Sequence, residues 1–148
     1  AMLGLAAQTL GEHAHRAALI EGIIDDAPAG PFDGAVCLLT LHFLATDERI
    51  RTAAEIRERL KPGAPFVAAH GSFPQGADER DRWLDRYAAY AIASGADPEQ
   101  TAGARTAVSQ HVAMLSPEAD VAALEAAGFI GVEQFYAAFT WRGWVAYA

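Results

Sequence analysis

Apolar positions recur at three- and four-residue intervals in several stretches of the chain, which predicts amphipathic helices. These stretches are residues 2–10, 46–60, 78–94, 97–110 and 116–127. Asp97 and Ser116 each precede a proline and predict N-caps, because a side-chain oxygen at that position accepts from unpaired backbone amides. Thr46 or Asp47 is expected to cap the second helix. The arginines of that helix, Arg49 among them, are expected to face water.

Short continuous apolar runs, bounded by turn residues, predict strands. They cover residues 17–22, 35–41 and 65–69. Such runs are typical of strands that are buried on both faces of a parallel sheet. Strand 35–41, a helix and strand 65–69 follow one another through short connections, so this part of the sheet is expected to be parallel. Residues 130–139 and 144–147 predict an antiparallel hairpin with its turn near residues 141–143.

This order of elements predicts an α/β fold with a mostly parallel sheet, ended by an antiparallel hairpin. The 148 residues suffice for one hydrophobic core, so we expect a single domain over residues 1–148. Two of the helices fall together between strands. They predict a helical insertion over residues 76–115, approximately.

Composition and charge narrow the classes of function. Hydrophobic residues make up 52% of the chain and charged residues 20%, which is typical of a globular protein. The net charge of −8 argues against broad nucleic-acid binding, because it repels phosphate backbones. No apolar run approaches the roughly 20 residues of a membrane span, so we expect no membrane association and a cytoplasmic location.

Four short motifs occur in an order that resembles class I S-adenosylmethionine-dependent methyltransferases. They are Phe32–Val36, Leu41–Leu44, Leu60–Ala64 and Ala126–Phe129. The layout is most similar to the carboxy-S-adenosylmethionine synthase group and its trans-aconitate-methyltransferase-like relatives, in which a paired-helix insertion follows strand five. The resemblance implies a Rossmann-like methyltransferase fold with S-adenosylmethionine as its cofactor.

Two departures from that family matter. The family's first strand and glycine-rich loop are absent from these residues, and we expect them upstream of Met2. A sheet lacking them would expose a strand edge, so a homo-oligomer is expected. The second departure is Ile23, where the family often has an aspartate that binds adenine. That contact is then either lost or made by Asp25.

The resemblance implies cofactor-binding residues at the ends of the predicted strands. These are Ile23, Ile24, Leu38, Leu39 and His42. Leu38 and Leu39 would contribute backbone carbonyls, and Ile24 would pack on adenine or donate its backbone N–H. The alternative for these aliphatic residues is ordinary packing in the sheet core.

His42 and His70 are the candidate catalytic residues. Each follows or ends a predicted strand at the edge of the sheet where ligands bind in open α/β folds. An imidazole titrates near neutral pH, so either side chain would orient the acceptor or serve as a base. The alternative is a packing or helix-capping histidine. No metal site is expected, because His13 and His15 lack a third ligand.

The sequence therefore predicts methyl transfer from S-adenosylmethionine to a small molecule or an RNA nucleoside. Methyl transfer is a displacement at an activated sulfonium, for which a protein mainly supplies proximity and orientation. The alternative is a non-catalytic binding or dimerisation module that kept the fold after losing its cofactor loop.

Overall fold

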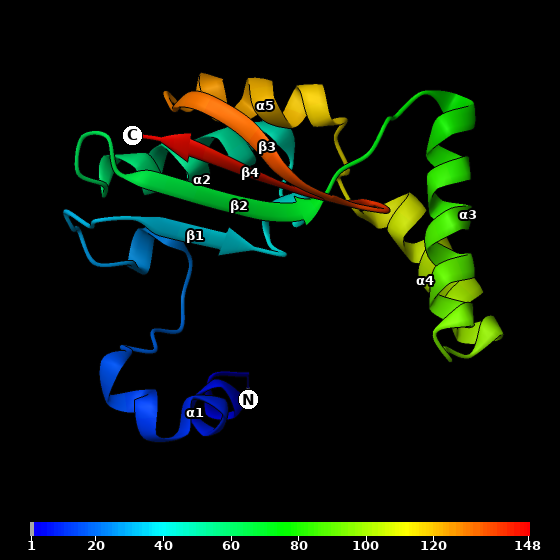
Figure 1. The fold of residues 1–148 in the computed structure, drawn as a ribbon, viewed down its shortest axis with the longest axis horizontal. Coiled ribbons are helices and arrows are strands. Elements are labelled where there is room, and N and C mark those ends of the chain that lie inside the picture. Colours follow the sequence, from blue (N-terminus) through cyan, green and yellow to red (C-terminus); the bar gives the residue numbers. More distant parts are fainter. Residues whose placement is uncertain (1) are drawn as a thin grey trace. The chain divides into compact units, whose positions relative to one another are not determined.

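The computed structural model describes residues 2–148, except for the side chains of residues 110 and 111. The described residues form two compact units, one up to Gly30 and the other spanning Pro31–Ala148. The sheet, its covering helices and the hydrophobic core all belong to the second unit (Figure 1).

The first unit contains helix α1 (Met2–Leu10), as predicted, followed by 3-10 turns at Gly11–Arg16 and Ile24–Asp26. The strand predicted over residues 17–22 is wrong. All six residues are exposed, and no strand pair among the described residues includes them. An apolar run becomes a strand only where a neighbouring strand satisfies its backbone N–H and C=O groups, and here none does.

The second unit is built on a four-stranded sheet. Its strands are β1 (Ala35–Leu38), β2 (Pro65–Gly71), β3 (Ile130–Ala138) and β4 (Trp141–Tyr147), in the spatial order β1-β2-β4-β3. The parallel pairing of β1 with β2 and the antiparallel β3–β4 hairpin confirm those predictions. The prediction of a mostly parallel sheet is wrong for the described strands, because β4 also pairs antiparallel with β2 and leaves β1–β2 as the one parallel pair. The hairpin turn lies at residues 139–140, before Trp141, and not at residues 141–143 as predicted. Phe139 adopts a left-handed φ of 50°. Aromatic residues rarely adopt this conformation, so Phe139 gives no indication in the sequence that the chain turns there.

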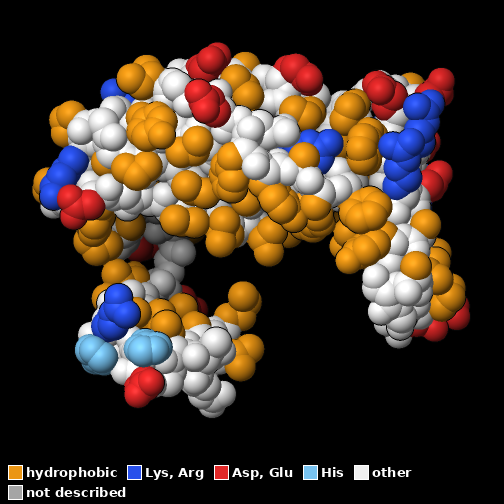
Figure 2. Space-filling view, viewed as in Figure 1, with side chains coloured by type: hydrophobic (Ala, Val, Ile, Leu, Met, Phe, Trp, Pro, Cys, Tyr) orange, Lys and Arg blue, Asp and Glu red, His pale blue; other side chains and the backbone are white. Residues whose placement is uncertain are grey.

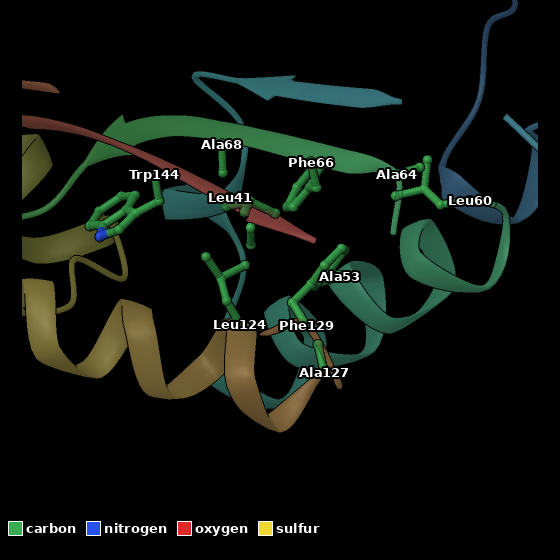
Figure 3. Close-up of a cluster of buried hydrophobic side chains, with 11 residues drawn as sticks. Leu41, Ala53, Leu60, Ala64, Phe66, Ala68, Leu124, Ala127, Phe129 and Trp144 are labelled. Atoms are coloured by element: carbon green, nitrogen blue, oxygen red, sulfur yellow. The ribbon is translucent and has the colours of Figure 1, made fainter. Parts of the chain in front are cut away.

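Two helices, α2 (Thr46–Glu58) and α5 (Pro117–Ala126), cover one face of the sheet (Figure 1). The core lies between these layers. Phe66 on β2 stacks on Phe129 with 4.9 Å between ring centroids, and Trp144 on β4 is fully buried (Figure 3). Alternate residues of each strand point to this face, and the residues between them point to the opposite face of the sheet.

The opposite face of β1 is exposed. Val36 and Leu38 retain 65% and 56% of their accessible surface, so the prediction that this strand is buried on both faces is wrong. No helix of the second unit packs over these two side chains, because α2 and α5 lie on the other face. Apolar side chains accordingly gather along one side of this unit in Figure 2.

Helices α3 (Ala77–Ala93) and α4 (Pro98–His111) follow β2 and form a helical hairpin beyond the sheet (Figure 1). Arg105 of α4 joins the two helices through Asp85 and Asp81 of α3, at 2.7 and 3.2 Å. The chain leaves and re-enters the sheet at adjacent points, since Ser72 and Leu115 form a parallel β-bridge.

The helix caps are correct in two cases of three. The Asp97 side chain accepts from the backbone N–H of Gln100 at 2.8 Å, and the Ser116 hydroxyl accepts from that of Ala119 at 3.2 Å. Helix α2 begins at Thr46, so its N-cap is Ala45 and not Thr46 or Asp47. The methyl group of Ala45 cannot accept a hydrogen bond, and neither predicted cap occupies the capping position.

Candidate functional site

The carboxyl ends of β1 and β2 lie side by side, because these strands are parallel, and two histidines lie there. His42 belongs to a one-turn 3-10 helix (Leu41–Phe43) that follows β1, and His70 is the penultimate residue of β2. Their side chains are buried, with residue exposures of 4% and 1%, and their ring centroids lie 6.2 Å apart. The structure thus brings together the two histidines selected from the sequence.

A pocket of about 190 Å³ opens beside His42. Its described walls come from the ends of β1 and β2, the start of β4 and the α3–α4 hairpin. They consist of His42, Phe43, Gly71, Phe73, Leu84, Tyr87, Val108, Val112, Met114, Thr140 and Trp141. Most of these side chains are apolar or aromatic, and none of those described is an Asp, Glu, Lys or Arg. His70 is not among them, so of the two histidines only His42 borders the pocket.

His42 is held in a setting that favours its neutral form. The backbone N–H of Gly71 donates to His42 Nδ1 at 3.4 Å, and the Trp141 ring lies edge-on, 5.7 Å away between centroids. Burial lowers the pKa of His42 from 6.5 to about 4, helped by nearby His70 and Arg49 and opposed by Asp120. His42 is therefore uncharged at neutral pH.

Behind His42, a buried ion pair joins the two helices that cover the sheet. Arg49 of α2 donates through Nη1 to Asp120 Oδ1 of α5, and both residues are 1% exposed. Arg49 Nη2 also donates to the carbonyl of Ala113 at 2.7 Å. His70 Nε2 lies 3.1 Å from the same Asp120 oxygen. Both partners lie at Oδ1 and offset part of the cost of burying the carboxylate, whose Oδ2 has no hydrogen-bond partner among the described residues.

The prediction that Arg49 faces water is wrong, and the network around Asp120 was missed. Helical spacing places Arg49 on the inward face, four and seven residues before Ala53 and Ile56, so the expectation followed from its charge and not from its position. Its partner lies 71 residues away. A second local signal was available. Asp120 precedes the inward-facing Leu124 by four residues, so the two share a helix face, and a carboxylate on a buried face needs a partner.

The residues predicted to bind the cofactor are divided between the two units. Leu38 and Leu39 lie at the exposed end of β1, close in the chain to His42, and Leu39 has a left-handed φ of 56°. The Leu38 carbonyl accepts from the Thr40 hydroxyl at 3.0 Å. Ile23 and Ile24 belong to the first unit. Ile23 is 65% exposed and its backbone N–H donates to the Asp26 carboxylate at 2.9 Å.

The described part of the chain contains neither a cluster of metal ligands nor a membrane-spanning helix. No group of three or more metal-ligating side chains gathers within residues 2–148 as described. Within the same residues, every helix is too short or too polar to cross a lipid bilayer.

Comparison with solved structures identifies similar folds at low sequence identity. An O-methyltransferase family 2 protein from Planctomyces limnophilus, in complex with apigenin, is 15% identical with a TM-score of 0.67; the match covers 98% of this chain and 39% of that one. Human N-acetylserotonin methyltransferase, in complex with S-adenosylmethionine, is 17% identical with a TM-score of 0.60, covering 95% and 37%. PigF with S-adenosylhomocysteine is 18% identical with a TM-score of 0.66, covering 98% and 39%.

These likenesses establish that the chain has the mixed α/β fold found in these methyltransferases. The chain spans about two fifths of the length of the proteins it matches. No protein-family model matches the sequence, and no curated protein matches it either.

Proposed function

We propose that the protein takes part in S-adenosylmethionine-dependent methyl transfer to a small, uncharged and largely apolar acceptor. The observation that carries the proposal is the apolar pocket beside neutral His42, at the carboxyl ends of β1 and β2. Open α/β sheets bind their ligands at this edge. Structures of the same fold include one with S-adenosylmethionine and one with S-adenosylhomocysteine, which supports this cofactor.

Leu38 and Leu39 meet some of the requirements of a cofactor-binding site. They present an exposed apolar strand end, and the left-handed backbone of Leu39 is a strained conformation of the kind that is concentrated at binding sites. Their side chains offer no polar group, so hydrogen bonds to a cofactor would come from backbone groups or other residues. When bound, S-adenosylmethionine supplies a methyl group on a positively charged sulfur that is activated for displacement.

The residues of this chain serve the reaction by holding the acceptor. The aromatic and aliphatic walls of the pocket exclude water and fix the orientation of a ring, which converts a bimolecular encounter into a positioned one. His42 contacts the acceptor directly. His70 supports that wall from behind, since it is held by Asp120 and does not border the pocket.

The size and charge of the pocket favour a small molecule over an RNA nucleoside. A cavity of roughly 150 Å³ holds one benzene molecule, so about 190 Å³ accepts a single substituted ring. No Lys or Arg lies on the described walls, and Arg49 behind them is already paired with Asp120. A carboxylate-bearing acceptor would lack a counter-charge on these walls. The pocket therefore gives no support to the narrower resemblance to trans-aconitate-methyltransferase-like proteins, which remains a prediction.

Calorimetric titration of S-adenosylhomocysteine into the protein tests the cofactor side of the proposal. We expect saturable binding that Leu38→Glu weakens at least about tenfold, because a carboxylate would be brought against the ligand without a partner. Val36→Glu is the matched control. Val36 is exposed on the same face of β1 but lies two residues before the strand end, so its substitution should leave the affinity unchanged.

Either of two results would contradict the proposal. One is an absence of heat with the unsubstituted protein. The other is an affinity for Leu38→Glu equal to that of Val36→Glu, which would remove the end of β1 from the site.

A further inference from the structure

We propose that His42 donates a hydrogen bond through Nε2 to a ligand in the pocket and does not act as a base. The site therefore selects neutral ligands that carry an oxygen atom able to accept this hydrogen bond. The inference rests on the proposed function only in taking that ligand to be the methyl acceptor. The oxygen that Nε2 binds is then not the atom that is methylated: the methyl group passes to another atom of the ligand as its bond to sulfur breaks, and a proton on that atom is released to solvent. The arrangement of the imidazole itself follows from contacts within the protein.

The proton position follows from the contact with Gly71. A neutral imidazole has one N–H and one lone pair, on opposite sides of the ring. The backbone N–H of Gly71 donates to Nδ1, so Nδ1 carries the lone pair. The proton is then on Nε2. Because Gly71 occupies the Nδ1 edge, Nε2 is the nitrogen that remains for a molecule in the pocket.

Met114 holds this contact in place. A Cβ added to Gly71 would lie 2.7 Å from Met114 Cε and 3.8 Å from His42 Cγ, so the absence of a side chain lets Met114 pack over the Gly71 backbone beside the imidazole. Met114 also lines the pocket. The thioether thus covers the Gly71 backbone on the pocket side, and water has little room to replace the Gly71 amide as the partner of Nδ1.

The charged groups around His42 oppose a second proton on the ring. Arg49 of α2 is a fixed cation and His70 of β2 is a further titratable neighbour; both disfavour a cationic His42. Asp120 of α5 is the carboxylate that acts in the opposite direction, and its Oδ1 already accepts from Arg49 and contacts His70. A proton on Nδ1 would also face the Gly71 N–H directly. His42 therefore remains a neutral donor.

Long-range ¹H–¹⁵N correlation spectra of ¹⁵N-histidine-labelled protein test the tautomer without any methyl transfer. We expect the His42 signals to show the neutral Nε2–H form from about pH 5.5 to 8, where an ordinary histidine would become protonated at the lower end. The resonance is assigned by its loss in His42→Gln. An Nδ1–H tautomer, or a cation at pH 6, would overturn the inference while leaving the cofactor proposal untouched.

Three ring probes of similar size test the selectivity: toluene, anisole and phenol. A donor at Nε2 binds the ether oxygen of anisole and the hydroxyl oxygen of phenol, so both should bind about three- to tenfold more tightly than toluene. A lone pair at Nε2 would favour phenol alone. His42→Leu should abolish the gain and His42→Gln, which keeps an N–H donor, should retain part of it. Tyr87→Phe, Thr140→Val and Trp141→Phe are the controls for the other side-chain donors on the described pocket walls.

The outcomes separate the two proposals. Equal affinity for toluene and anisole, or a gain that survives in His42→Leu, overturns the donor role. If none of the three probes binds while S-adenosylhomocysteine does, the inference and the acceptor pocket are wrong and the cofactor side of the proposed function stands.

Discussion

At the scale of single residues, the buried Arg49–Asp120 ion pair determines how much stability a substitution behind His42 costs. Both groups are charged and about 1% exposed, and Asp120 also contacts His70. Two ions taken out of water gain little beyond what their desolvation costs, but removing one of them leaves the other unpaired in a medium that solvates it poorly. The pair is therefore more important for holding α2, β2 and α5 in one arrangement than for net stability.

Arg49→Met is expected to lower the free energy of unfolding by about 3–5 kcal/mol, because it leaves the Asp120 carboxylate without its cation. The double variant Arg49→Met with Asp120→Asn should recover most of the loss, since the amide oxygen still accepts from His70 and carries no charge. Urea denaturation measures both. The matched control is Arg105→Met, whose partially exposed pairs should cost about 0.5–1 kcal/mol. A loss for Arg49→Met no larger than for Arg105→Met would contradict this account.

The buried imidazole of His42 predicts a pH dependence of stability. Folding lowers its pKa from 6.5 to about 4, so between these values the unfolded chain binds a proton that the folded chain does not. Stability contributed by this site therefore falls as the pH drops from about 6.5 to 4, by at most about 3 kcal/mol. The measurement is the difference in unfolding free energy between the unsubstituted protein and His42→Gln across that range. A difference that stays constant with pH would refute the prediction.

These residues also show what sequence reasoning could reach. His42 and His70 were found because both follow from one rule, that parallel strands end at a common edge. The burial of Arg49 was missed although its spacing to Ala53 puts it on the inward face, because a cation was expected in water and its partner lies far away in the chain. The tautomer of His42 could not be predicted either, since it depends on a backbone amide of another strand.

At the scale of elements, local chemistry and the pairing of strands that follow one another were predictable, whereas pairing between strands far apart in the chain was not. The caps of α4 and α5 depend on side chains within three residues, and both were correct. The run over residues 17–22 has the composition of a strand, but a strand also needs a neighbour, and that requirement lies outside the run. The hairpin turn was misplaced because Phe139, with a left-handed backbone, is not a residue type that marks turns.

The uncapped start of α2 predicts a stabilising substitution. Ala45 is exposed, its backbone has the extended conformation of an N-cap, and its side chain makes no capping hydrogen bond. Ala45→Asp should add about 1 kcal/mol to the free energy of unfolding, because the carboxylate accepts from a first-turn amide and lies at the positive end of the helix dipole. Thermal denaturation measures the gain. Ala45→Val, which supplies bulk without an acceptor, should give none, and equal effects of the two substitutions would exclude capping as the cause.

At the scale of the whole molecule, the two units differ in how much buried apolar surface stabilises each of them. The buried core lies entirely in Pro31–Ala148, whereas residues 2–30 contain no buried side chain. The first unit therefore has little apolar burial of its own to oppose local opening. The expected homo-oligomer remains a prediction at this scale, consistent with the exposed Val36 and Leu38 on the open face of the sheet.

Limited proteolysis should reveal this division. Trypsin is expected to cut first after Arg16, which is exposed and precedes the exposed residues 17–22, and to leave the second unit largely intact. Residues 17–22 belong to no helix or strand. Mass spectrometry of the early fragments identifies the site, and Arg16→Gln should slow the first cut. Early fragments that end at Arg57 or Arg142 would show instead that the sheet and its covering helices open as readily as the first unit.

The β-bridge between Ser72 and Leu115 marks where the chain leaves the sheet for the α3–α4 hairpin and returns to it. The hairpin also contacts β4 and its turn, through Tyr87 against Trp141 and Tyr90 against Phe139. Both ends of the intervening segment are fixed by backbone contacts, Phe73 N–H to the Leu115 carbonyl among them, which any sequence can make. The hairpin supplies Leu84, Tyr87 and Val108 to the pocket, while Arg49, His70 and Asp120 stay in the framework. Residues 74–112 therefore form an exchangeable segment, while Ala113, which accepts from Arg49, and Met114, which packs over Gly71, stay in the framework. Replacing this segment with a helical hairpin that has different wall residues would change which molecules enter the pocket. His42 and the residues that support it would stay the same.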